Sequence, residues 1–273
     1  MRISAIILSF NSEAHIERCL LSLIAGLNGT AEPDEIWVID NGSIDRTPTI
    51  LRRFEEDFPR VMRVIYHTYN LGTTISRNLA LRRATGRYLM VMDSDVIELP
   101  RKTIDTLIEF LGMDRTCGIA VPRLIYPDGR FQLSTDVFPT IPRKLQRFFR
   151  LRAIEAVVGQ TTPPSEIGSV DYAISALWLL RRDVLERVGV FDERIFYSPE
   201  DVDYCLRVWK AGLRVVYVPS VHAVHDAREI SRGFKRPRFT VSHAQGLLYL
   251  FAKHRYGLSR KRLYRRIGRY EHE

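Results

Sequence analysis

The chain has 273 residues, of which 45% are hydrophobic, and this is enough to fill one large α/β domain or two small ones. No apolar run reaches the roughly 18 residues that a membrane-spanning helix needs, and the first ten residues lack a full signal-peptide core, so we expect a globular protein that is not exported. Cys19, Cys117 and Cys205 are scattered, which indicates reduced thiols in a cytosol rather than disulfides or a zinc site, and Cys19 and Cys205 lie on apolar helix faces, as core residues do.

The net charge of +9 is carried by one end of the chain. Residues 228–273 contain 13 Lys and Arg but only three Glu, whereas the rest contains 28 basic and 29 acidic residues. The main body is therefore close to neutral. The basic C-terminus predicts an anionic partner for that segment alone.

In chain order, the first half alternates strands with helices. Apolar runs predict strands at 3–10, 35–40, 63–67 and 87–92, and apolar periodicity predicts helices that begin at Ser12 or cover 47–58, 75–85 and 101–111. This order predicts right-handed βαβ units and a mostly parallel sheet flanked by helices.

The second half is less regular. It predicts a hairpin turn at 126–130, a basic amphipathic helix at 141–158, and strands at 171–182 and 214–219. The clearest helix of the chain covers 198–212, with Ser198 as N-cap, Pro199 in the first turn and Gly212 as its stop.

Polar clusters follow three of the predicted strands, at 9–11, 40–43 and 93–95. Parallel sheets bind ligands at the carboxyl ends of their strands, so these clusters should line one crevice. The sequence has neither of the glycine-rich loops that cradle phosphates in dinucleotide-binding and P-loop proteins. A phosphate in this crevice would need another device to neutralise it.

Asp93 and Asp95 offer such a device, because alternate residues of an extended chain share a face. Nothing nearby in the sequence compensates their charge. Mn²⁺ or Mg²⁺, held by these carboxylates and by substrate phosphates, would do so. His225, just after the last predicted strand, is either a surface histidine or a third ligand. The alternative for the acids is a polar loop before helix 101–111.

Glu200 and Asp201 open the 198–212 helix, and two interpretations stay open. Carboxylates in a first helical turn are stabilising, and Ser198 with Asp201 resembles a capping box. Alternatively, one of them takes a proton from an acceptor hydroxyl as a general base.

Taken together, five blocks resemble the family 2 inverting glycosyltransferases, in particular their rhamnosyltransferase-like bacterial branch. The blocks are ILSFNSEAHIERCLLSL, WVIDNGSIDRT, NLGTTISRNLALRRATGRYLMVMDSDV, LWLLRRDVLERVGVFDERIFYSPEDVDYCLRVWKAGLRVVYVP and VHDAREIS. They cover most of residues 3–231, in order. The resemblance implies a GT-A fold in residues 1–230, with a nucleotide-binding half (1–100) and an acceptor and catalytic half (101–230). Residues 231–273 would form a basic, helical extension.

The resemblance also implies roles by position. Nucleotide-sugar contacts would come from Ser9, Asn11 and Glu13 (base pocket), Asp40 and Asn41 (base or ribose), Arg77, Asp93 and Ser94. Asp93, Asp95 and His225 would hold the metal, and Asp201 would be the catalytic base with Glu200 in support. Ser175-Ala176 and Thr73-Thr74 depart from the family pattern, which leaves the donor sugar open.

The expected function is metal-dependent transfer, with inversion, of a sugar from a nucleotide-diphosphate sugar to a saccharide or polyprenyl-linked saccharide in cell-envelope polysaccharide synthesis. The basic C-terminus would bind the anionic inner face of the cytoplasmic membrane. Two alternatives are a catalytically silent nucleotide-sugar-binding module and a nucleic-acid-binding protein that uses the basic tail. Against the latter, RRM and zinc-finger motifs are missing.

Overall fold

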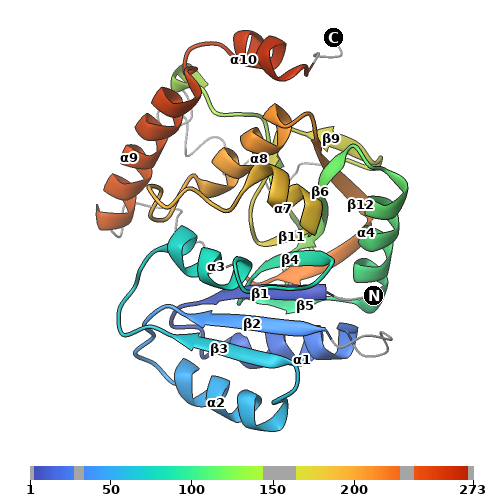
Figure 1. Cartoon of the computed structure of the whole chain (residues 1–273), viewed down its shortest axis with the longest axis vertical. Coiled ribbons are helices and arrows are strands. Elements are labelled where there is room, and N and C mark those ends of the chain that lie inside the picture. The colour runs from blue at the N-terminus through green and yellow to red at the C-terminus, as the bar shows by residue number, and fades with distance from the viewer. Residues whose placement is uncertain (1–2, 28–33, 144–163, 228–236, 270–273) are drawn as a thin grey trace.

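The computed structural model describes residues 3–27, 34–143, 164–227 and 237–269 (Figure 1). Its centre is a ten-stranded sheet with the order β3-β2-β1-β4-β11-β6-β12-β5, in which β7 adds to β6 and β9 adds to β12. The strands are β1 (Ile3–Ser9), β2 (Glu35–Asp40), β3 (Met62–Tyr66), β4 (Tyr88–Asp93), β5 (Val96–Glu98), β6 (Cys117–Ile125), β7 (Phe131–Gln132), β9 (Gly168–Val170), β11 (Leu177–Arg181) and β12 (Arg214–His225). A separate pair joins β8 (Thr135–Asp136) to β10 (Tyr172–Ala173).

The first half of the sheet is parallel, as predicted. Strand β1 pairs in parallel with both β2 and β4, and β2 pairs in parallel with β3. Ile3, Ala5 and Ile7 of β1 face one core, whereas Ile6 faces the other. This alternation explains the unbroken apolar run, because a parallel sheet is covered on both faces.

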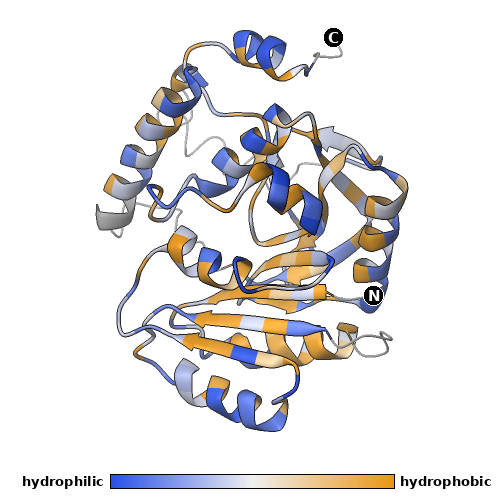
Figure 2. Ribbon diagram, viewed as in Figure 1, coloured by the Kyte–Doolittle hydropathy of each residue, from blue (hydrophilic) through white to orange (hydrophobic). Residues whose placement is uncertain are grey.

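Helices form a layer on each face of the sheet. The first core holds α1 (Ile16–Leu27), α2 (Thr47–Asp57) and α4 (Arg101–Met113) against the strands. The second holds α3 (Thr73–Leu81), α7 (Arg182–Val188) and α8 (Glu200–Lys210), with α9 (Pro237–His254) and α10 (Arg260–Ile267) outside α8. All three cysteines are free and buried, and burial was expected for Cys19 and Cys205. Strand β1 is largely orange in Figure 2 and α10 is largely blue.

The second half differs from the prediction in several places. Strand β6 was not predicted, because Pro122 lies inside its apolar run and proline is unfavourable in strands. The expected strand 171–182 is split into β10 and β11, and β11 runs antiparallel to both neighbours. His225 is the last residue of β12 and not a residue beyond it. The helix expected at 141–158 falls mostly outside the described residues.

Both serine N-caps were predicted wrongly. Helix α1 begins at Ile16, and the Ser12 hydroxyl lies 2.8 Å from the Ser94 hydroxyl. Helix α8 begins at Glu200 with no side-chain hydrogen bond at its N-cap. The Ser198 hydroxyl instead lies 3.0 Å from His243 Nδ1 of α9. Each serine hydroxyl therefore contacts a residue distant in the sequence and does not cap the helix that the local pattern predicted.

The described part of the C-terminal extension, residues 237–269, is largely helical, as predicted, but part of its charge is used inside the molecule. Lys253 Nζ donates to Asp192 Oδ2 at 2.7 Å and to Asp203 Oδ1 at 2.6 Å. Arg269 is ion-paired with buried Asp171 at 2.7 Å. Among the described residues, none of the helices combines the length and apolar character that crossing a bilayer requires.

Candidate active site

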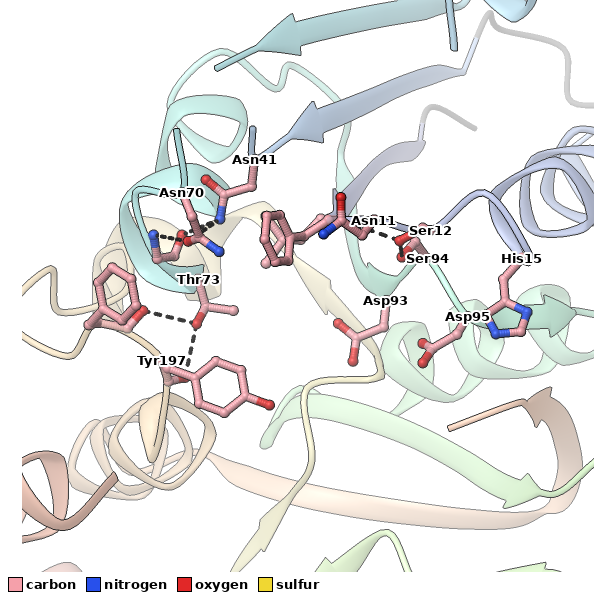
Figure 3. Close-up of a pocket in the computed structure, with 14 residues that line it drawn as sticks. Asn11, Ser12, His15, Asn41, Asn70, Thr73, Asp93, Ser94, Asp95 and Tyr197 are labelled. Atoms are coloured by element: carbon pink, nitrogen blue, oxygen red, sulfur yellow. Dashed lines mark hydrogen bonds between the residues drawn. The ribbon is translucent and has the colours of Figure 1, made fainter. Parts of the chain in front are cut away.

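A cavity of about 280 Å³ opens at the carboxyl ends of β1 and β4, where ligands of parallel sheets bind (Figure 3). It is lined by Leu8, Phe10, Asn11, Ser12, His15, Asn41, Asn70, Gly72, Thr73, Asp93, Ser94, Asp95, Phe196 and Tyr197. The polar clusters after strands β1, β2 and β4 all contribute to it. The predicted crevice therefore exists.

Three predicted metal ligands lie close together, and two of them, Asp93 and Asp95, line this cavity. Asp93 ends β4, Asp95 follows two residues later, and His225 ends β12 on the far side of β11 and β6. One ligand atom from each lies within 4.8 Å of the others. We call these residues the metal group. A pair of carboxylates and an imidazole is a donor set that suits Mn²⁺.

The orientation of His225 supports this fit. Its Nδ1 lies 2.9 Å from Gln132 Oε1, an oxygen that can only accept a hydrogen bond, so Nδ1 carries the proton. In the neutral imidazole, Nε2 then presents its lone pair to Asp95 Oδ1 at 3.1 Å. Two acceptors facing each other at this distance are well placed to share a cation. A buried partner for the second ring nitrogen is also typical of metal-binding histidines.

Arg77 of α3 connects the metal group to the acids of α8. Its Nη2 is ion-paired with Asp93 Oδ1, and its Nη1 lies 3.3 Å from Glu200 Oε1. Arg77 is only 1% exposed. The Ser175 hydroxyl accepts from Arg77 Nη1 at 2.8 Å and donates to Glu200 Oε1 at 3.1 Å. The sequence near the acids indicated no compensating charge, and the structure supplies one for Asp93 from Arg77, which lies 16 positions earlier in the chain.

Arg77 does not neutralise the site completely. Burial raises the pKa of Asp93, and the charge of Asp95 adds to this effect, so that together they outweigh the opposing effect of Arg77. Burial lowers the pKa of His225, but the hydrogen bond and charge of Asp95 more than offset it, so the pKa is raised. The single guanidinium of Arg77 is shared between Asp93 and Glu200 and makes no ion pair with Asp95, so a divalent cation would add the positive charge that the two metal-group carboxylates favour.

Glu200 and Asp201, which we call the acid pair, differ in their surroundings. Glu200 is 8% exposed, and burial, followed by the charge of Asp201, raises its pKa against the opposing effect of Arg77. Asp201 is half-buried, and its Oδ1 accepts from the amide of Val202 at 2.7 Å. No capping box with Ser198 forms. Burial also raises the pKa of Tyr197, a cavity residue, and the charge of Glu200 raises it further.

Comparisons with known proteins agree with this geometry. Residues 4–189 match the family described as Glycosyl transferase family 2. The chain belongs to this family. It is 28% identical over 271 residues to an N-acetylglucosaminyl-diphospho-decaprenol L-rhamnosyltransferase of Mycobacterium tuberculosis, covering 90% of this chain and 83% of that protein. It is also 42% identical over 65 residues to the rhamnosyltransferase WbbL of Escherichia coli, covering 24% of this chain and 25% of that protein.

A solved structure shows the same fold. The mannosyltransferase PcManGT of Pyrobaculum calidifontis, in complex with GDP-Man and Mn²⁺, aligns with a TM-score of 0.65 and 23% identity, covering 98% of this chain and 68% of that one. The chain is thus a glycosyltransferase with the GT-A fold, in the rhamnosyltransferase-like branch, as predicted. The silent-module and nucleic-acid-binding alternatives gain no support from these comparisons.

The predicted nucleotide contacts of this glycosyltransferase fall into two groups. Asn11, Asn41, Asp93 and Ser94 line the cavity. The residues described as lining it do not include Ser9, Glu13, Asp40 or Arg77. Glu13 Oε2 accepts from the amide of Arg46 at 3.0 Å. Asp40 is 2% exposed, and its Oδ1 has no hydrogen-bond partner within the described part of the chain.

Asn41 has a structural task in the enzyme. Its Oδ1 accepts from the Leu71 amide and the Ser76 hydroxyl, both at 2.9 Å. Its Nδ2 donates to Asn70 Oδ1 at 2.9 Å and to the Gly72 carbonyl at 3.2 Å (Figure 3). A side-chain amide has two protons and two lone pairs, and all are used. A contact with base or ribose would require one of these bonds to break.

Several residues of the site were not found from the sequence. His15, Asn70, Phe196 and Tyr197 line the cavity, and Gln132 orients His225. Phe196 and Tyr197, directly before Ser198, were the one local sequence signal that pointed to the site. His15, Asn70 and Gln132 lie in segments whose positions relative to the cavity depend on the tertiary fold.

Gln132 gives a direct test of the metal group. Gln132→Leu removes the acceptor for His225 Nδ1, so we expect Mn²⁺ affinity to fall by about 10–100-fold, as for other residues that orient metal ligands. Gln132→Glu keeps an acceptor and should bind Mn²⁺ far better than the leucine variant. Titration calorimetry with Mn²⁺ alone measures this, and equal affinity in wild type and Gln132→Leu would contradict the assignment.

Proposed function

We propose that this glycosyltransferase moves a sugar, with inversion and with a divalent metal, from a nucleotide-diphosphate sugar to a saccharide or lipid-linked saccharide acceptor in cell-envelope polysaccharide synthesis. One observation carries the proposal: Arg77 bonds to both Asp93 and Glu200. This contact joins Asp93, which lines the cavity, to Glu200, and it supports a single site that includes the metal group and the acid pair.

The roles follow from the surroundings of each residue. Asp93, Asp95 and His225 would hold Mn²⁺ or Mg²⁺, which stabilises negative charge on a departing diphosphate when bound. Asp201 is the more accessible member of the acid pair, and it accepts the proton of the acceptor hydroxyl as that oxygen attacks the anomeric carbon from the opposite face. Glu200 is buried against Arg77 and Ser175, so it holds the Arg77 side chain in place.

Nucleotide recognition would use the strand-end residues of the first half. Asp40 and Ser9 carry buried side-chain oxygens without partners among the described residues, as expected for groups that a ligand would satisfy. Asn11, Ser94 and Asp93 line the cavity directly. Glu13 stays a predicted base-pocket residue, although it is exposed and tied to the amide of Arg46.

A donor screen tests the function. Purified protein with Mn²⁺ is heated with UDP-, GDP- and dTDP-sugars, and the donor should raise the melting temperature because it binds only the folded state. At one hundred times its Kd, a ligand adds about 2.7 kcal/mol to the free energy of unfolding. EDTA should cancel the rise. A melting temperature that no donor changes would contradict the proposal.

The relative from Mycobacterium tuberculosis bears a name with a decaprenol-linked acceptor, which supports a lipid-linked acceptor here as well. Such an acceptor requires work at a membrane surface, on the cytoplasmic face where nucleotide sugars are made. The positive charge that could bind lipid is smaller than the total charge of the C-terminal segment, because Lys253 and Arg269 form ion pairs within the protein. The exposed cations of α10 are Lys261, Arg262, Arg265 and Arg266, and exposed Arg255 lies between α9 and α10.

These exposed cations give a prediction about membrane binding. Replacing Lys261, Arg262, Arg265 and Arg266 by Gln should lower the affinity for anionic vesicles by about fivefold per residue, since each contributes about 1 kcal/mol near the surface. Sedimentation with the vesicles measures this affinity. The control replaces four exposed arginines elsewhere: Arg18, Arg60, Arg83 and Arg87. Equal sedimentation of both variants and wild type would refute membrane binding through α10.

A further inference from the structure

Helix α9 lies directly against the segment that leads into α8. Gly246 stands at the contact: a Cβ atom added there would overlap the carbonyl oxygen of Ser198 and come within 2.9 Å of Pro199 Cδ. One turn earlier, His243 Nδ1 lies 3.0 Å from the Ser198 hydroxyl. The helix therefore touches the chain immediately before the acid pair.

The same segment is held from its other side by α3. The amide of Thr73 donates to the Phe196 carbonyl at 2.7 Å, and its hydroxyl donates to the Tyr197 carbonyl at 2.9 Å. The Thr74 hydroxyl donates to the Ile195 carbonyl at 2.7 Å. Residues 195–199 thus lie between α3, at the cavity, and α9, with contacts to each.

Helix α9 is also fixed to α8 beyond the acid pair. Asp203, which is 1% exposed, accepts from Lys253 Nζ at 2.6 Å and from His254 Nε2 at 2.8 Å. Lys210 Nζ at the end of α8 donates to His254 Nδ1 at 2.6 Å. The start of α8 therefore has contacts with α9 both before and after the acid pair in the sequence.

These contacts are separate from the face of α9 that solvent or a membrane would meet. Val241 and Leu248 on that face are 55% and 67% exposed. Gly246 is buried against the 195–199 segment instead. A role for the buried face is therefore independent of membrane binding.

We infer that α9 is a positioning element for the acid pair, acting through residues 195–199. The inference rests on the proposed function, in which Asp201 accepts the proton. A base must lie within hydrogen-bond distance of the acceptor hydroxyl, and a displacement of about 1 Å can cost on the order of 10²-fold in rate. The metal group and the predicted nucleotide contacts lie on α3, or on and directly after β1, β2, β4 and β12, so donor binding should depend much less on α9.

Gly246→Ala tests this in the full-length enzyme. The added methyl group must push the 198–199 backbone away, so kcat should fall by about 10²-fold while the calorimetric Kd for Mn²⁺ with nucleotide stays at the wild-type value. Gly112→Ala is the matched control, because a Cβ at that helical glycine meets no atom within 4 Å. It should keep full kcat and full binding.

His243→Ala is the second variant, since it removes the bond to Ser198 without adding atoms. It should lower kcat by less than Gly246→Ala, again with unchanged Kd. Normal kcat in both variants overturns the inference. So does a parallel loss of kcat, nucleotide binding and melting temperature in both, because that is a purely structural effect. Sugar transfer by the wild-type enzyme is measured alongside, and its absence would count against the proposed function instead.

Discussion

Asp201→Asn should lower turnover by about 10²–10⁴-fold while leaving metal-dependent nucleotide binding unchanged. The amide cannot accept the proton of the acceptor hydroxyl at neutral pH, yet it has almost the same shape as the carboxylate. Its oxygen can still accept from the Val202 amide, which Asp201 Oδ1 does at 2.7 Å. Binding is followed by calorimetry, and turnover by release of nucleoside diphosphate.

Two further variants separate this result from a general charge effect. Asp105→Asn removes a carboxylate from the exposed face of α4 and should change neither quantity. Glu200→Gln alters a buried group that contacts Arg77 and Ser175, so it should disturb nucleotide binding as well as turnover. Unchanged turnover in Asp201→Asn would remove this residue from the mechanism.

Asp93→Ala should abolish metal-dependent binding of the nucleotide. The substitution removes one ligand of the metal group and also removes one of the two ion pairs of the buried Arg77, which keeps its contact with Glu200. Losing a direct ligand should cost more than the 10–100-fold in metal affinity that is usual for residues behind the ligands. Calorimetry of the nucleotide, with Mn²⁺ and then with EDTA, measures the loss.

Asp93→Asn refines this test. The amide oxygen can still accept from Arg77, so the variant should melt close to wild type while binding Mn²⁺ poorly. Glu98→Gln, an exposed change on β5, is the control and should bind normally. Normal binding by Asp93→Ala, or full activity of EDTA-treated enzyme, would refute the metal assignment.

The sequence predicted the first half of the fold well, because strand and helix periods there alternate without interruption. The strand-end clusters also led to Asp93 and Asp95. It could not show that Arg77 reaches Asp93, since that contact depends on how α3 packs against the sheet. The same holds for Gln132, which lies 93 positions from His225. The second half was predicted less well because Pro122 interrupts the apolar run of β6, and because β11 runs antiparallel to β4.

The basic C-terminus shows a similar limit. Its net charge was read from composition, but the acids that pair with Lys253 lie 50 and 61 positions earlier in the chain. Composition gives the sum of charges and not their partners. The boundary between residues 1–230 and 231–273 stays a prediction, although the contacts of α9 with α8 argue for treating the two as one catalytic unit.

The two sides of the metal group are already joined by backbone hydrogen bonds. The amide of Asp226 donates to the Asp95 carbonyl at 2.9 Å, and β5 pairs with β12 at His225 and Val96. Folding itself therefore brings together positions 130 residues apart. The conformational entropy of assembling the cluster is lost when the protein folds and not when a ligand arrives, so capture of a cation should need little rearrangement of the main chain.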